Sequence, residues 1–131
     1  MTPPLLGRIL VVEDEPDLAE SLENNLTRCG YDAHAALSPE RGLSLIADGN
    51  FDLLLTDLMM PGMNGIETLK EIRKIDEHVP VYIVTAFLKE FLELLNVAVK
   101  QGIKFEVLNK PIELQQIRTL VKGALENPAS Y

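Results

Sequence analysis

The stretch from Phe51 to Gly65 has the sequence FDLLLTDLMMPGMNG. Its apolar run, Leu53–Leu55, is soon followed by the acid Asp57 and by a loop of methionine, proline and glycine. A short apolar run with turn residues behind it is typical of a strand that is buried on both faces. We therefore expect Asp57 to lie at the carboxyl end of a parallel strand, where open α/β sheets bind ligands. A carboxylate there can serve as a nucleophile, as a metal ligand, or as both.

Four other segments of the chain are also predicted to be strands, of which Tyr31–Ala36 is a weaker one. They are Arg8–Glu13, Tyr31–Ala36, Val81–Thr85 and Phe105–Leu108. Apolar residues at helical spacing predict a helix after each strand, over about 16–29, 39–47, 65–76, 88–101 and 112–126. The crossovers are long and two-residue hairpin turns are absent. The order therefore predicts a doubly wound α/β domain with a five-stranded parallel sheet and five helices.

Length and composition predict a single globular domain. The chain has 131 residues, of which 47% are hydrophobic and 24% charged. We expect the domain to span residues 8–126, with tails at 1–7 and 127–131. The net charge of −8 argues against direct nucleic-acid binding by this domain. The single cysteine, Cys29, and the lack of a membrane-spanning segment or signal peptide predict a cytoplasmic protein without membrane contact.

Polar residues stand where four of the predicted strands end. The first strand ends in Glu13-Asp14, the central one in Asp57 and the fourth in Thr85, and Lys110 follows the fifth. The carboxyl ends of parallel strands share one edge, so these side chains should converge at one crevice. Three carboxylates repel one another unless a cation is present. An all-oxygen site of this kind suits Mg²⁺ better than a transition metal.

Each of these residues has an ordinary structural interpretation when it is taken alone. Asp14 could be a helix cap, Thr85 the N-cap of the next helix, and Lys110 a solvated surface side chain. Met59 could be loop or core filler. The coincidence at four separate strand ends nevertheless favours a functional site.

At these residues the chain resembles the receiver domain of bacterial two-component response regulators. The matching pieces are Glu13-Asp14, Asp57 within TDLMMPGMNG, Thr85-Ala86 and Lys110-Pro111, each after a predicted strand. The resemblance extends from about residue 8 to residue 126. It implies a flavodoxin-like sheet with the strand order 2-1-3-4-5.

The resemblance also implies a chemistry for these residues. Asp57 would accept a phosphoryl group from a histidine of a sensor kinase or phosphotransfer protein, as an aspartyl phosphate. Asp14, Asp57 and the backbone carbonyl of Met59 would coordinate Mg²⁺, with Glu13 contributing through water. The protein would then be no enzyme in the usual sense, since it would catalyse only its own phosphorylation and dephosphorylation.

Two further residues receive roles from the resemblance. Lys110 would pair with a phosphoryl oxygen, aimed inward by a cis peptide bond to Pro111. Thr85, followed by Ala86, would move toward the phosphoryl group and hydrogen-bond another oxygen, which would link the chemistry to a change of shape.

The chain departs from the family on the fifth strand. Receiver domains usually have an aromatic residue three positions before the lysine, and that position is Val107 here. Phe105 should lie on the same face of the strand, about 7 Å farther from the site. Either Phe105 takes a shifted role, or the movement of Thr85 is transmitted without a swinging ring. We favour the second because of that distance.

The predicted fourth helix has more apolar residues than one buried stripe needs. We expect Leu88, Leu92, Leu95 and Val99 to face the core, which leaves Phe91, Leu94 and Ala98 near the surface. Deep coverage by neighbouring elements is the alternative. An exposed apolar patch would serve self-association as a homodimer or the docking of an output domain or protein.

Two other functions remain open. The first is a phosphorylation-independent pseudo-receiver that acts only as an interaction module. The second is a phosphohydrolase with an aspartate nucleophile, similar to the haloacid dehalogenases. Those enzymes have a second acid two residues after the nucleophile, whereas this chain has Asp57-Leu58-Met59.

Overall fold

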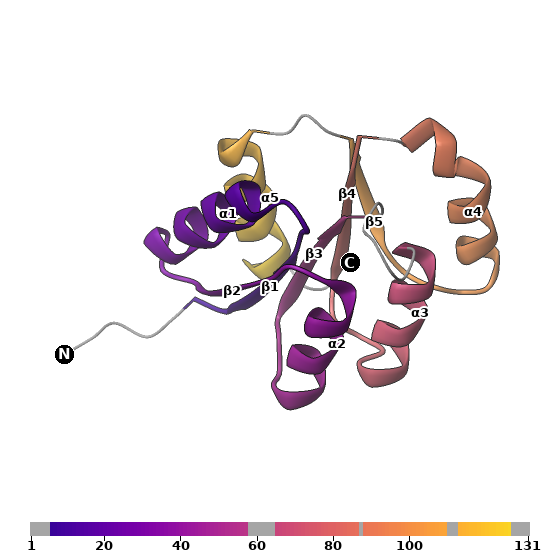
Figure 1. Ribbon diagram of the computed structural model, residues 1–131, viewed down its shortest axis with the longest axis horizontal. Coiled ribbons are helices and arrows are strands. Elements are labelled where there is room, and N and C mark those ends of the chain that lie inside the picture. Colours follow the sequence, from indigo (N-terminus) through magenta and orange to yellow (C-terminus); the bar gives the residue numbers. More distant parts are fainter. Residues whose placement is uncertain (1–5, 58–64, 87, 110–112, 127–131) are drawn as a thin grey trace.

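The computed structural model describes residues 6–57, 65–86, 88–109 and 113–126. Strands and helices alternate along this part of the chain (Figure 1). The strands are β1 (Arg8–Val12), β2 (Asp32–Ala36), β3 (Leu53–Asp57), β4 (Val81–Thr85) and β5 (Glu106–Asn109). The helices are α1 (Pro16–Arg28), α2 (Pro39–Asp48), α3 (Gly65–Ile75), α4 (Leu88–Lys100) and α5 (Leu114–Glu126).

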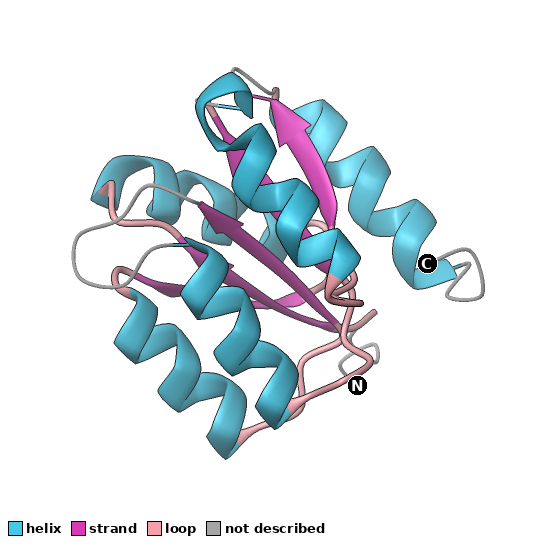
Figure 2. Ribbon diagram, turned by 90° about the vertical axis from the view of Figure 1, so that its right-hand side faces the viewer, coloured by secondary structure: helices cyan, strands magenta, loops and turns pink. Residues whose placement is uncertain are grey.

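The five strands form one parallel sheet in the order β2-β1-β3-β4-β5. This is the doubly wound arrangement predicted from the alternation of elements, and its strand order is the one that the resemblance implied. Helices α1 and α5 cover one face of the sheet, while α2, α3 and α4 cover the other (Figures 1 and 2). None of the described helices is long and apolar enough to cross a membrane.

Alternation along the strands divides the core into two layers. In β1, Leu10 and Val12 pack toward α2, α3 and α4, while Ile9 and Val11 pack toward α1 and α5. In β3, Leu53 and Leu55 pack in the layer under α1 and α5, and Leu54 packs in the layer under α2, α3 and α4. Successive side chains of a strand point to opposite faces, so an uninterrupted apolar run fits a strand with helices on both sides.

Local signals in the sequence set the helix ends close to where the structure has them. Pro16 and Pro39 begin α1 and α2, and the Ser38 hydroxyl oxygen accepts a hydrogen bond of 3.2 Å from the Arg41 N–H. After α1, Gly30 adopts a φ of +100°, a conformation that residues with a Cβ rarely tolerate. This turn leads the chain directly into β2.

The structure corrects the predicted core face of α4. Leu95 is buried and Leu94 exposed, as expected, but Leu92 and Val99 are 46% and 60% exposed, whereas Ala98 is fully buried. At 3.6 residues per turn, Ala98 lies about 60° to one side of Leu95, while Leu92 and Val99 lie about 60° and 40° to the other. The helix is thus rotated toward Ala98, whose small side chain allows close packing. The side chains of Leu88 and Phe91 lie outside the described part.

The end of α3 turns away from the core. Leu69, Ile72 and Ile75 are apolar and three residues apart, but Ile75 is 45% exposed while the other two are fully buried. Steps of three residues fall behind the helical repeat by about 60° each, so Ile75 is rotated by about 120° from Leu69. The face of α3 therefore turns out of the core at its last residue.

Candidate functional site

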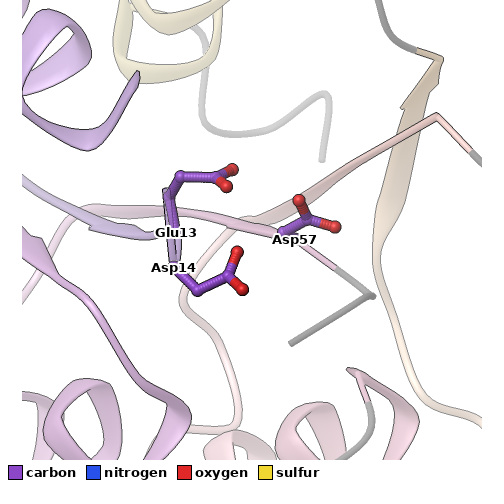
Figure 3. Close-up of side chains that lie close together, drawn as sticks. All are labelled: Glu13, Asp14 and Asp57. Atoms are coloured by element: carbon purple, nitrogen blue, oxygen red, sulfur yellow. The ribbon is translucent and has the colours of Figure 1, made fainter. Parts of the chain in front are cut away.

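Three carboxylates from two strands meet at the carboxyl edge of the sheet. Glu13 and Asp14 follow β1 directly, and Asp57 is the last residue of β3. One carboxylate oxygen from each residue lies within 4.8 Å of the others. Figure 3 shows the side chains of Glu13 and Asp14 extending from the end of β1 toward that of Asp57.

Strand register is the cause of this convergence. β1 and β3 are adjacent and parallel, with Val12 opposite Thr56, so the next residues along the two strands are Glu13 and Asp57. A backbone hydrogen bond of 3.0 Å from Glu13 N–H to the Ala36 carbonyl continues the β1–β2 pairing by one residue. The Glu13 carboxylate also accepts a bond of 3.4 Å from the Glu15 N–H, which ties it to the turn before α1. The pairing of the strands thus sets the positions of Glu13 and Asp57.

Burial increases the electrostatic repulsion between these carboxylates. Glu13 is 5% exposed and Asp57 is 7% exposed. Like charges at this distance, with little water around them, repel one another unless a cation balances them. Carboxylate oxygens are the ligands that hard divalent cations such as Mg²⁺ take, so the donor set fits a magnesium ion.

Thr85 lies at the same edge of the sheet, one strand away. Asp57 pairs with Val84 across β3 and β4, so Thr85 is one residue beyond Asp57 along the strand direction. Its side chain is fully buried, and the residue that follows it, Ala86, is exposed. The register therefore places Thr85 at the same edge of the sheet as the acids.

Val107 and Phe105 lie on one face of the sheet, as the alternation predicts. Both are partly buried and pack against the core layer under α2, α3 and α4. Val107 pairs with Ile83 in β4, two residues before Thr85. Phe105 precedes the first residue of β5 and lines a hollow with Val99 and Gly102, toward the amino end of the strand. The aromatic ring is thus remote from the acids.

Three of the residues predicted to form the site lie outside the described residues. They are Met59, Lys110 and Pro111. Their expected roles as carbonyl ligand, phosphoryl partner and cis proline stay predictions.

An apolar cleft that the sequence does not predict lies beside the acids. Its volume is about 400 Å³, and its walls include Leu18 and Leu22 of α1 and Leu114 and Ile117 of α5. Glu13 and Asp57 also line it. Leu18 and Leu22 share one helical stripe, but their spacing predicts only burial. This spacing does not indicate that α1 and α5 leave a space between them.

Comparison with known proteins gives consistent results. Residues 9–122 match the family model described as the response regulator receiver domain. The response regulator protein PilR of Pseudomonas aeruginosa is 36% identical over 118 residues, which are 90% of this chain and 26% of PilR. This chain spans between 26% and 51% of the length of the curated relatives compared.

Solved structures agree with the sequence match. The CheY-like receiver domain protein from Methanospirillum hungatei JF-1 has a TM-score of 0.84 at 26% identity, covering 95% of this chain and 97% of that one. The response regulator TrrA from Thermotoga maritima, solved in complex with Mg²⁺ and BeF, has a TM-score of 0.74 at 31% identity, covering 88% and 96%. Both alignments span nearly the whole fold.

Proposed function

This chain belongs to the family of response regulator receiver domains of two-component systems, and from that premise we propose that Asp57 is its phosphoacceptor. The observation that supports this proposal most is the acidic cluster, in which carboxylate oxygens of Glu13, Asp14 and Asp57 lie within 4.8 Å of one another. Of the three, Asp57 alone is itself the last residue of a strand in the middle of the sheet. We further propose that residues 8–126 form the complete receiver unit, with tails on either side.

The proposed reaction is a phosphoryl transfer from a phosphohistidine of a sensor kinase or phosphotransfer protein. A carboxylate oxygen of Asp57 attacks phosphorus, an O–P bond forms, and the N–P bond to the donor imidazole breaks. The imidazole leaves with the bonding electron pair and takes up a proton. Hydrolysis of the aspartyl phosphate by water later returns the carboxylate and releases inorganic phosphate. The protein would thus act as a catalyst only on itself.

Glu13, Asp14 and Asp57 are the residues that would hold Mg²⁺, together with the backbone carbonyl of Met59. The ion would neutralise the carboxylates and the incoming phosphoryl oxygens, which is most of what this chemistry requires. The donor set supports the assignment, and so does TrrA, whose structure contains Mg²⁺. Glu13 would contribute by positioning a water molecule and by balancing the positive charge of the ion.

The roles proposed for Thr85 and Lys110 follow from the same chemistry. The Thr85 hydroxyl would donate to a phosphoryl oxygen, and the Lys110 ammonium would pair with another, next to Pro111. Thr85, followed by Ala86, would shift toward that oxygen, which would link the chemistry to a change of shape. Val107 leaves no aromatic ring to follow it, so we propose that the shift itself is the signal.

We propose that α4 is the surface that transmits the signal to an output domain or protein, or to a second copy. Four of its apolar side chains are at least 46% exposed, namely Leu92, Leu94, Val97 and Val99. Apolar residues gathered on one exposed element are typical of contact surfaces. Sedimentation of the protein with and without beryllofluoride would test self-association. A monomer under both conditions at high concentration would leave only the output-partner role.

The sharpest test is mass spectrometry after treatment with acetyl phosphate and Mg²⁺. The wild type should gain one phosphoryl group on Asp57, and Asp57→Asn should gain none. Removal of the divalent ion with EDTA should also prevent labelling, whereas the exposed-site control Asp17→Asn should label normally. Failure of the wild type to label would support the alternative of a pseudo-receiver. Steady turnover of small phosphate esters would instead support a hydrolase.

A further inference from the structure

The sheet has an edge at β2, beside helix α1. The strand order places β2 at one end of the sheet, and among the described strands it pairs with β1 alone (Figure 1). A strand in this position has backbone N–H and C=O groups on its outer side that no other strand of its own sheet uses. Such groups can pair with an extended strand of another molecule, so this edge is a contact surface that the protein must either use or close.

Backbone hydrogen bonds indicate which residues of β2 face outward. The Asp32 N–H donates over 2.8 Å to a carbonyl of the segment that leads into β1, and the Ala36 carbonyl accepts over 3.0 Å from the N–H that follows β1. In a parallel pair, the residues whose backbone groups point to the neighbouring strand alternate along the chain. His34 therefore faces β1 together with Asp32 and Ala36. The backbone groups of Ala33 and Ala35 lie on the outer side.

Glu23 of α1 binds one of these outer groups. Its carboxylate accepts a hydrogen bond of 2.6 Å from the Ala35 N–H, so a side chain takes the place that an added strand would occupy. The same bond agrees with the alternation, because it shows that the Ala35 N–H points away from β1. Both residues are partly buried. A hydrogen bond to a charged acceptor is about twice as strong as one between neutral groups, which favours a lasting contact.

The outer side of β2 is complementary to itself. In an antiparallel pair with the β2 strand of a second copy, Ala33 would lie opposite the partner's Ala35, and Ala35 opposite the partner's Ala33. Each such pair exchanges two hydrogen bonds, and half of these bonds need an Ala35 N–H. The side chains of both residues are small, so they allow the two strands to approach. The occupant that fits this edge is therefore a second copy of the same strand.

We propose that Glu23 closes this edge against a second copy of the chain, and that two β2 strands pair when its carboxylate is removed. The carboxylate opposes pairing in two ways. It occupies the Ala35 N–H, and its negative charge would lie close to the carbonyl oxygen of the partner's Ala33, which needs that N–H as a donor. The proposal does not depend on whether Asp57 accepts a phosphoryl group.

Sedimentation velocity without metal ion or phosphodonor tests the proposal. We expect Glu23→Ala to form a dimer at least tenfold more tightly than the wild type, which is the scale of one hydrogen bond to a charged group. Glu20→Ala removes the same charge from an exposed position of α1 and should match the wild type. Adding Ala33→Pro to Glu23→Ala should restore the monomer, because the N–H that proline lacks lies on the outer side, where β1 does not use it.

Amide hydrogen exchange followed by NMR gives a second readout, which holds even where a variant does not fold. In the wild type the Ala35 amide should be protected, and the Ala33 amide on the same edge should exchange at least tenfold faster. In dilute Glu23→Ala the Ala35 amide should lose its protection, and both amides should become protected as the dimer forms.

Several results would overturn the proposal. They are an unprotected Ala35 amide in the wild type, a folded Glu23→Ala protein that stays monomeric at millimolar concentration, and equal dimerisation of Glu20→Ala. A Glu23→Ala dimer in which the Ala33 amide still exchanges freely would place the contact on another surface, and would also overturn it.

Discussion

At the scale of single residues, Glu13 and Asp57 show a tension between stability and function. Both carboxylates are at least nine-tenths buried, and both lie within 4.8 Å of each other and of Asp14. Neutral side chains of similar size would avoid the repulsion between these acids. Carboxylates retained in this position are expected of a site that binds a cation.

Glu13→Gln should therefore stabilise the protein in the absence of divalent ions. We expect an increase of about 1 kcal/mol in the free energy of unfolding, because the variant keeps the side-chain size and removes one of the clustered charges. Urea denaturation in EDTA measures it. The control is Glu20→Gln on the exposed side of α1, which should change stability by less than about 0.5 kcal/mol. A loss of stability in Glu13→Gln alone would contradict the interpretation.

Tyr31 gives the protein a predictable response to alkaline pH. Burial raises the pKa of its hydroxyl above the ordinary value of 10.0, and the nearby Cys29 and Glu126 raise it further. The folded state then holds the proton of Tyr31 more tightly than the unfolded state does. The stability that protonated Tyr31 contributes is therefore fully present below pH 10.0 and is lost as pH rises through the folded-state pKa. Tyr31→Phe should lose less stability between pH 9 and pH 11 than the wild type. Parallel curves for the two proteins would exclude this effect.

At the scale of elements, α4 differs most from the sequence-based expectation. Its length and position are as predicted, but its buried face is centred between Leu95 and Ala98. The apolar residues on its other sides face water, so the helix presents apolar side chains beyond those its own core contact uses. This is the structural basis for assigning it a role in contact with other molecules.

A pair of substitutions distinguishes the two orientations of α4. Ala98→Leu should cost about 1–3 kcal/mol of unfolding free energy, because the larger side chain has no room at a fully buried position. Val99→Ala should change stability by about 0.5 kcal/mol or less, since Val99 is 60% exposed. The orientation predicted from sequence gives the opposite ranking. Chemical denaturation of the two variants beside wild type would decide between them.

At the scale of the whole molecule, the sheet connects distant parts of the sequence. Its order places β1 between β2 and β3, and β4 beside β3. Glu13, Asp57 and Thr85 are far apart in the chain but stand at the ends of three successive strands. A ligand that bridges these strands would stabilise the folded state as a whole, since the unfolded chain does not assemble the site.

Mg²⁺ should accordingly raise the melting temperature. At about 100 times the dissociation constant, mass action predicts about 2.7 kcal/mol of additional stability. Asp57→Asn should lose most of this gain, whereas Asp17→Asn on α1 should retain it. Sodium chloride at equal ionic strength controls for general screening of the net charge of −8. An equal rise with both salts would indicate screening in place of a specific ion.

Much of this molecule follows from local pattern in the sequence. The alternation of elements, the helix starts at Pro16 and Pro39 and the turn at Gly30 were all predictable, because each depends on residues close together in the chain. The edge at which Glu13, Asp57 and Thr85 gather was predictable too, because parallel strands all end on the same side. The resemblance to receiver domains supplied the strand order.

The tertiary structure alone decided the features that depend on how elements meet. The spacing of apolar residues in α4 allowed several inward faces, and contact with the neighbouring layer selected the one with Ala98. The register of Val12 opposite Thr56 brought Glu13 against Asp57. The space between Leu22 and Leu114 arises from the separation of two helices, which no single stripe encodes. Periodicity gives the direction of a side chain relative to its own element, but contact distances are set only when elements pack against one another.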